Sequence, residues 1–112
     1  MDPQRAAELL KQARERIERA LADLSEGGDE ELSHVDQHLA DEGSELFEEE
    51  LDAGIAQRLR DELAAVERAE ARLAAGKYGL SIESGEPIPD ERLEALPAAE
   101  RTVEEQTRYE QS

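Results

Sequence analysis

The sequence predicts an all-α fold, in which an antiparallel coiled-coil helical hairpin carries a small C-terminal finger-like lobe. Residues 6–24 and 44–75 both have apolar residues at every third or fourth position, which is the spacing of an amphipathic helix. Aromatic residues make up 3% of the 112 residues, so a bulky compact core is not expected. We therefore expect a hairpin over residues 1–75, with an acidic tip segment at about 26–43, and a separate lobe over 76–112.

The first helix is expected to begin at the Asp2-Pro3 pair, since Asp is a good N-cap and Pro suits the first helical position. Its apolar seam consists of Ala6, Leu10, Ala13, Ile17, Ala20 or Leu21, and Leu24. We expect this helix to end near Ser25, where Gly27 and Gly28 follow.

The second helix should run from Ser44 to Ala75, because its apolar residues form one continuous stripe. They are Phe47, Leu51, Ile55, Leu59, Leu63, Val66, Ala69 and Leu73. A helix of this length with a single apolar stripe requires a partner helix, which the first helix supplies. Gly54 lies within this helix at a cost of about 1 kcal/mol relative to alanine, but the stripe continues past it, so we expect no break there.

The lobe begins after Gly76, where the composition changes to Gly, Pro and Ser. Leu80 and Ile82 alternate as in a short strand of a hairpin, and residues 90–95 have the pattern of a single helical turn. Pro97 is placed to open a last helix.

The charge of the chain is strongly negative and unevenly distributed. The formal net charge is −17, and no Lys or Arg occurs between Arg19 and Arg58, a span that contains thirteen carboxylates. Binding to nucleic acid is disfavoured, because that affinity comes largely from Lys and Arg displacing counterions. A basic protein surface is the better-matched partner, and the simpler interpretation is a solvated acidic face.

Several classes of function are disfavoured by residues that the sequence lacks. There is no cysteine for disulfides or thiolate ligands. No apolar run is long enough to span a membrane, and the N-terminus does not resemble a secretory signal, so we expect a cytoplasmic protein without membrane contact. We also find no nucleophile-base pair, phosphate loop or cofactor motif, which predicts a non-enzyme without cofactors. His34 and His38 have a spacing that metals use, but the pattern is weak.

The stretch from Gly76 to Gln106 resembles the C-terminal zinc finger of the DksA/TraR family, and the resemblance extends over about 38–106. The family pattern is G-x-Y-G-x-C-x-x-C-G-E-x-I, then R-L-x-A-x-P-x-A and a final C-x-x-C. Its matching residues here are Gly76, Tyr78, Gly79, Gly85, Glu86, Ile88, Arg92, Leu93, Ala95, Pro97, Ala99 and Gln106. The resemblance implies a hairpin that carries a degenerate zinc finger.

The four cysteine positions of that pattern hold Ser81, Ser84, Thr102 and Glu105. Neutral hydroxyls are poor zinc ligands, so we predict that the lobe binds no zinc. Burial of aliphatic side chains is expected to offset part of the stability lost with the metal, at about 1.5–3 kcal/mol for each side chain that is fully buried. The candidates are Leu80, Ile82, Ile88, Leu93, Leu96 and Val103, with Leu73 and Tyr78 packing the lobe against the hairpin.

The resemblance also implies a function. Family members bind RNA polymerase directly and insert the coiled-coil tip into its secondary channel without contacting DNA, and some act together with ppGpp. Their tip motif D-x-x-D-x-A corresponds here to residues 38–43, with His38 and Gly43 as departures, Asp41 retained and Glu42 beside it. Asp41 is therefore the candidate tip residue, and a helix-capping or solvated loop carboxylate is its alternative role.

The predicted partner is thus RNA polymerase, with ppGpp as a further ligand at the interface, and the predicted protein is a monomer. A second hypothesis is an acidic helical protein that binds or sequesters another basic protein. Self-association through the apolar stripes is a third.

Overall fold

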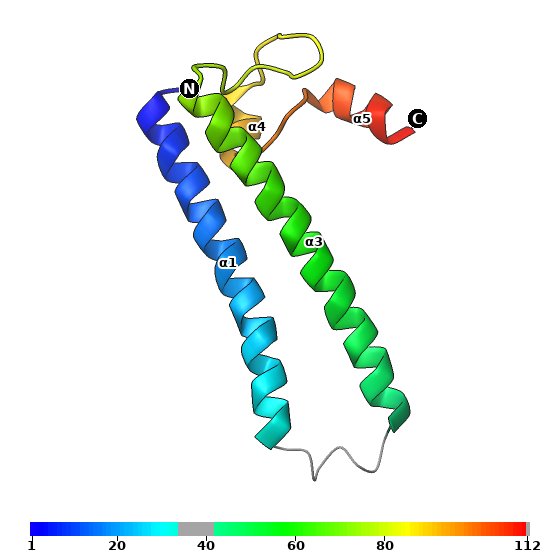
Figure 1. Ribbon diagram of the computed structural model, residues 1–112. Coiled ribbons are helices and arrows are strands. Elements are labelled where there is room, and N and C mark those ends of the chain that lie inside the picture. The colour runs from blue at the N-terminus through cyan, green and yellow to red at the C-terminus, as the bar shows by residue number, and fades with distance from the viewer. Residues whose placement is uncertain (34–41, 112) are drawn as a thin grey trace. The chain divides into compact units, whose positions relative to one another are not determined.

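The computed structural model describes residues 1–33 and 42–111 (Figure 1). The helices in these ranges are α1 (Pro3–Ser33), α3 (Glu42–Ala74), α4 (Asp90–Ala95) and α5 (Val103–Gln111). The β structure of the described residues is one isolated antiparallel bridge between Leu80 and Pro87. The predicted all-α hairpin is confirmed. Among the described residues, no helix is both long and apolar enough to cross a membrane.

The chain divides into two compact units, and each long helix contributes to both. One unit contains Met1–Arg14 and Ala64–Ser112, and the other contains Glu15–Leu63. The first unit therefore joins the beginning of α1, the end of α3 and the whole lobe. The second unit contains the remainder of both long helices. The boundary at residue 76 that the composition indicates stays a prediction.

In the first unit, the beginning of α1 packs against the end of α3. The side chains of Ala6, Leu10, Ala13, Val66 and Ala69 are all buried, as their helical spacing predicts. At the start of α1 the Asp2 carboxylate accepts the N–H of Arg5 at 3.1 Å. The predicted N-cap is therefore present, since this bond satisfies one of the free N–H groups at the helix start.

An arginine and a glutamate join the two helices of this unit. Arg14 Nη2 lies 2.6 Å from Glu70 Oε1, and its Nε donates to Oε2 at 3.1 Å. Arg14 also lies 3.6 Å from a carboxylate oxygen of Glu67. The hydrogen bond from Arg14 lowers the pKa of Glu70, although partial burial opposes the shift.

In the second unit, Ile17 is buried, and Leu21, Leu24, Leu59 and Leu63 are partly buried. Leu51 and Ile55 are exposed, although they continue the predicted apolar stripe of α3. Gly54 lies inside α3 without a break in the helix, as expected.

The predicted end of α1 near Ser25 is wrong, because the helix continues through Gly27 and Gly28 to Ser33. Glycine lowers helix stability by about 1 kcal/mol per residue but does not prevent helical backbone angles, and no proline lies in this stretch.

α3 ends with a Schellman motif at Gly76. Gly76 has φ of +74°, its N–H donates to the carbonyl of Leu73 at 3.1 Å, and the N–H of Lys77 donates to the carbonyl of Arg72 at 2.8 Å. These bonds satisfy carbonyl groups that the helix end would otherwise leave free. The helix therefore stops where the composition changes, as predicted.

A small apolar core lies inside the lobe. It consists of Ile88, Leu93 and Ala99, with Met1 and Tyr78 packed against it. The Tyr78 hydroxyl donates to the carbonyl oxygen of Pro97 at 2.7 Å, and burial raises the pKa of Tyr78.

The expected contribution of six aliphatic side chains to the lobe is wrong for four of them. Leu80, Ile82, Leu96 and Val103 are between 40% and 58% exposed. A segment of this size has too little volume to enclose every aliphatic side chain. Burial in the apolar core therefore replaces less of the stability that a zinc ion would supply than the sequence indicated.

Two further expectations for the lobe are corrected. Leu80 forms an isolated bridge rather than a strand, and the N–H of Ile82 donates to the carbonyl of Glu100 at 2.9 Å. The last helix begins at Val103, not at Pro97. The residue before it, Thr102, has the side chain of a preferred N-cap, and this outweighs the preference of proline for the first helical position. The short helix predicted at residues 90–95 is confirmed as α4.

Ion pairs attach the lobe to the helix ends in the first unit. Glu100 accepts hydrogen bonds from Arg68 and Arg72, each at 3.0 to 3.1 Å. The bond from Arg68 is the largest cause of the lowered pKa of Glu100. On the α1 side, Arg5 Nη2 lies 2.8 Å from Glu94.

Candidate functional site

The loop that follows the isolated bridge is organised by serine hydroxyls. The buried Ser81 Oγ accepts the N–H of Glu83 at 3.0 Å and the N–H of Ser84 at 3.2 Å. Ser84 Oγ accepts the N–H of Glu86 at 3.2 Å. Gly85, with φ of +76°, closes the turn by donating to the Ser81 carbonyl at 3.0 Å. The loop therefore uses the side chains at two of the four cysteine positions of the family pattern to satisfy its own backbone.

The residues at the other two cysteine positions form a capping box at the start of α5. Thr102 Oγ1 accepts the N–H of Glu105 at 3.2 Å, and Glu105 Oε1 accepts the N–H of Thr102 at 2.9 Å. This reciprocal pair is the T-x-x-E arrangement that satisfies two free donors at a helix start. It fixes where α5 begins.

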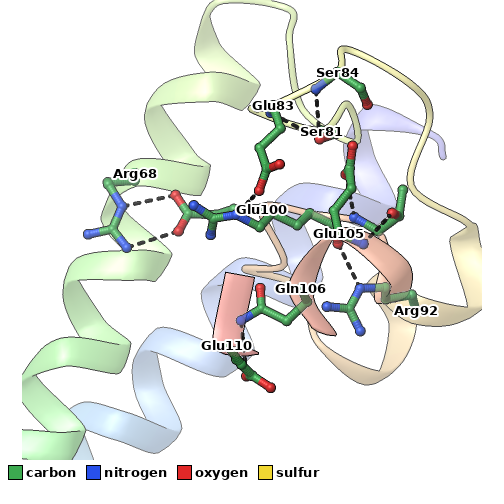
Figure 2. Close-up of polar contacts among 11 residues, drawn as sticks. Arg68, Ser81, Glu83, Ser84, Arg92, Glu100, Glu105, Gln106 and Glu110 are labelled. Atoms are coloured by element: carbon green, nitrogen blue, oxygen red, sulfur yellow. Dashed lines mark hydrogen bonds and ion pairs between the residues drawn. The ribbon is translucent and has the colours of Figure 1, made fainter. Parts of the chain in front are cut away.

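In Figure 2 the side chain of Glu105 points from α5 toward Ser81 and Ser84 of the loop. Its side chain is buried, with a relative exposure of 6%. Hydrogen bonds from the Ser81 and Ser84 hydroxyls, with the backbone bond from Thr102, lower the pKa of Glu105 to about 2, although burial opposes the shift. The carboxylate therefore stays ionised inside the lobe.

Arg101 makes a second link between the loop and α5. Its Nε donates to Glu83 at 2.5 Å, and its guanidinium lies 3.8 Å from the centre of the Tyr109 ring. The backbone carbonyl of Arg101 accepts the Nε–H of Arg92 from α4 at 2.9 Å. On α5 itself, Gln106 donates to Glu110 at 3.1 Å (Figure 2).

Comparisons with known proteins place this lobe in a family. The prokaryotic dksA/traR C4-type zinc finger matches residues 82–111. General stress protein 16O of Bacillus subtilis is 42% identical over 77 residues, which cover 68% of this chain and 47% of that protein. The RNA polymerase-binding transcription factor DksA of Caulobacter vibrioides is 35% identical over 103 residues, which cover 92% of this chain and 66% of that protein.

A solved structure has a similar fold. Transcription factor DksA2 of Pseudomonas aeruginosa matches with a TM-score of 0.52 and 27% identity, over 92% of this chain and 84% of that one. This chain belongs to the DksA/TraR family. It spans about half the length of the Bacillus general stress protein that it matches.

The residues at the DksA/TraR ligand positions do not fit a zinc ion. Three of them carry neutral hydroxyls, and the one carboxylate, Glu105, already accepts several hydrogen bonds. A structural zinc site needs four good donors in a tetrahedron, usually thiolates or imidazoles. In the ranges 1–33 and 42–111, no group of three or more His, Cys, Asp or Glu side chains is arranged to hold a metal ion. The lobe brings the four positions together with a chemistry unsuited to zinc.

The predicted tip residues of this DksA/TraR chain fall mostly outside the described part. His38 and Asp41 lie outside the described residues, as does His34. Glu42 and Gly43 are the first two residues of α3, and the structure describes only their place in the helix. The role of these residues at the tip stays a prediction.

Sequence reasoning missed the structural role of Glu105. The T-V-E-E sequence at residues 102–105 is a capping-box signal, and it marks the start of α5 from local sequence alone. The contact with Ser81 and Ser84 has no comparable local signal, because it joins residues more than twenty positions apart.

Proposed function

We propose that this chain is a transcription regulator that binds RNA polymerase directly and inserts its helical hairpin into the secondary channel, without contacting DNA. Membership of the DksA/TraR family is the observation that carries the proposal, since one relative is an RNA polymerase-binding transcription factor. In this role the chain acts in the cytoplasm, as a monomer and not as an enzyme.

The charge of the chain supports the same proposal. A net charge of −17 with a long stretch free of Lys and Arg repels a phosphate backbone. The same charge attracts a basic protein surface and speeds the encounter with it.

Co-purification with RNA polymerase core enzyme tests the binding step. We expect the tagged chain to retain the core subunits at low salt and to lose them when another secondary-channel factor is added in excess. Loss in that competition assigns the site, since binding elsewhere on the enzyme would survive it. Failure to retain the core at low salt would instead favour an acidic protein that binds or sequesters another basic partner.

Asp41→Asn tests the proposed tip residue. We expect the variant to bind polymerase as the wild type does but to lose most of its effect on transcription in vitro, because the substitution removes one charge and almost no volume. Asp52→Asn is the matched control, since Asp52 is exposed on α3 within the same acidic stretch. Equal transcriptional effects of the wild type and Asp41→Asn would remove Asp41 from the mechanism.

The same transcription assay tests the proposed contribution of ppGpp. We expect ppGpp to increase the effect of the wild-type chain on polymerase. An effect of the chain that is identical with and without ppGpp would remove the alarmone from the proposal.

A further inference from the structure

At the four positions where the family has zinc-binding cysteines, the signs of the charges are the reverse of those in a zinc finger. In a zinc finger, a cation lies at the centre and anionic ligands surround it. Here the central group is the Glu105 carboxylate, and donors surround it: the hydroxyls of Ser81 and Ser84 and the N–H of Thr102. We propose that Glu105 replaces the metal ion as the group that holds α5 on the loop of residues 81–86. We call this arrangement the carboxylate clasp.

The burial of α5 supports this role for Glu105. Glu105 is the buried residue of this helix, whereas Val103 and Tyr109 are 58% and 57% exposed. A nine-residue helix is marginal on its own in water, so it needs contacts with the rest of the lobe. Because its apolar side chains supply little burial, the polar contacts at its N-terminal end must hold it in place.

The polar groups around Glu105 are held in place by hydrogen bonds. Ser81 Oγ accepts two backbone N–H groups and Ser84 Oγ accepts one, so the loop fixes both hydroxyls on the side of Glu105. Glu105 exchanges backbone hydrogen bonds with Thr102, at 2.9 and 3.2 Å. No buried side-chain nitrogen or oxygen in the described part of the chain lacks a partner. A fully satisfied polar cluster of this kind is rigid and is costly to open.

The neighbouring charged groups have partners of their own. Glu83 of the loop pairs with Arg101, and Arg92 of α4 donates to a backbone carbonyl. Glu86 of the loop and Glu104 of α5 are exposed. Arg68 and Arg72 of α3 pair with Glu100, and Arg108 of α5 is exposed but has contacts of its own. The bonds that hold Glu105 ionised come from hydroxyl and amide donors rather than from an arginine.

This composition predicts that the clasp is insensitive to both metal and salt. The clasp contains no thiolate that zinc would bind, so chelators have nothing to remove. Its bonds are local and partly buried, and ions in solution screen such bonds much less than exposed ion pairs. The proposal does not depend on binding to RNA polymerase.

Amide hydrogen exchange on the full chain with Glu105→Gln tests the clasp. Glutamine keeps the volume and can still serve in a capping box, but it lacks the charge that the serine hydroxyls bind. At neutral pH we expect exchange in residues 81–86 and 103–111 to become about tenfold faster or more, as befits the loss of hydrogen bonds to a charged acceptor. Exchange in the buried part of α1 should not change.

Glu104→Gln is the matched control, because it removes the same charge from the neighbouring exposed position. We expect its exchange to equal that of the wild type. Equal exchange in Glu105→Gln and the wild type would overturn the proposal. If Glu105→Gln fails to fold, Ser84→Ala serves instead, since it removes one hydroxyl beside Glu105 from an exposed position and leaves the capping box intact. Its exchange is compared in residues 103–111, because the substitution also removes the acceptor of the Glu86 N–H in the loop. Wild-type exchange in Ser84→Ala would overturn the proposal equally.

The same exchange experiment, repeated with a chelator and with added zinc, distinguishes the clasp from a zinc site. We expect exchange in residues 81–111 to be unchanged by a strong chelator and by added zinc. Faster exchange after chelation, or zinc that co-purifies in equal amount with the chain, would contradict the proposal whatever the variants show.

Discussion

Single residues decide where the helices of this protein stop, and Gly76 is the clearest case. Its φ of +74° lies in the left-handed region that favours glycine, and the Schellman bonds of α3 depend on this conformation. A Cβ added at Gly76 would meet nothing within 4 Å, so a side chain there is opposed by the backbone conformation and not by crowding.

The pair Gly76→Ala and Gly54→Ala tests this distinction. Gly76→Ala should lower the free energy of unfolding by about 1–2 kcal/mol, because an L-residue is strained at positive φ. Gly54 also has open space around it but lies inside α3, so Gly54→Ala should raise the free energy of unfolding by about 0.5–1 kcal/mol. Urea denaturation followed by circular dichroism measures both. A change of the same sign in both variants would refute the argument.

At the scale of elements, the long helices and the short helix α4 could be predicted from the sequence, whereas the contacts that shape the rest of the lobe could not. The seam of α1, from Ala6 to Ile17, repeats at a helical period, and local sequence is enough to recognise it. The arrangement of the lobe depends on contacts between distant residues. Ser81 meets Glu105, and Ile82 meets Glu100, without any periodic pattern. Hydropathy also ranks Val103 above Glu105 for burial, and the structure reverses that order.

The packed seam of α1 predicts a large cost for Leu10→Ala. The side chain of Leu10 is 1% exposed, and truncating a buried leucine costs about 2–5 kcal/mol of unfolding free energy because it leaves a cavity. Leu51→Ala makes the same change at a side chain that is 53% exposed, so it should cost about 0.5 kcal/mol or less. Thermal and urea unfolding compare the two, and similar losses would show that burial does not distinguish these positions.

In the first compact unit, three carboxylates with lowered pKa values make the free energy of unfolding depend on pH. The pKa values of Glu70, Glu100 and Glu105 all lie below the ordinary value of 4.5. A group whose pKa is lower in the folded state stabilises the fold fully above the ordinary pKa. That contribution disappears as the pH falls through the folded value.

Glu105 is expected to lose its contribution between about pH 4.5 and about 2. The difference in unfolding free energy between the wild type and Glu105→Gln should therefore be largest above pH 5 and should shrink steadily toward pH 2. Urea titrations at each pH measure this difference, and taking the difference cancels the effect of the many exposed carboxylates. A gap that stays constant down to pH 2 would contradict the assignment.

Repeating the titrations at high salt separates the three groups. Glu70 and Glu100 owe their lowered pKa values mainly to arginines, so salt should weaken their contributions. The gap between the wild type and Glu105→Gln should change little, because hydroxyl and amide donors hold that carboxylate.

The bonds between the lobe and the start of α1 also constrain how the protein is made. Arg5 binds Glu94, and the amino group of Met1 lies 3.3 Å from Asp90, so these contacts join residues about ninety positions apart. On a ribosome, the first turns of α1 emerge long before their partners are synthesised, and contacts of such long range form slowly. The beginning of α1 must therefore remain without these neighbours until residues 90–94 have been synthesised.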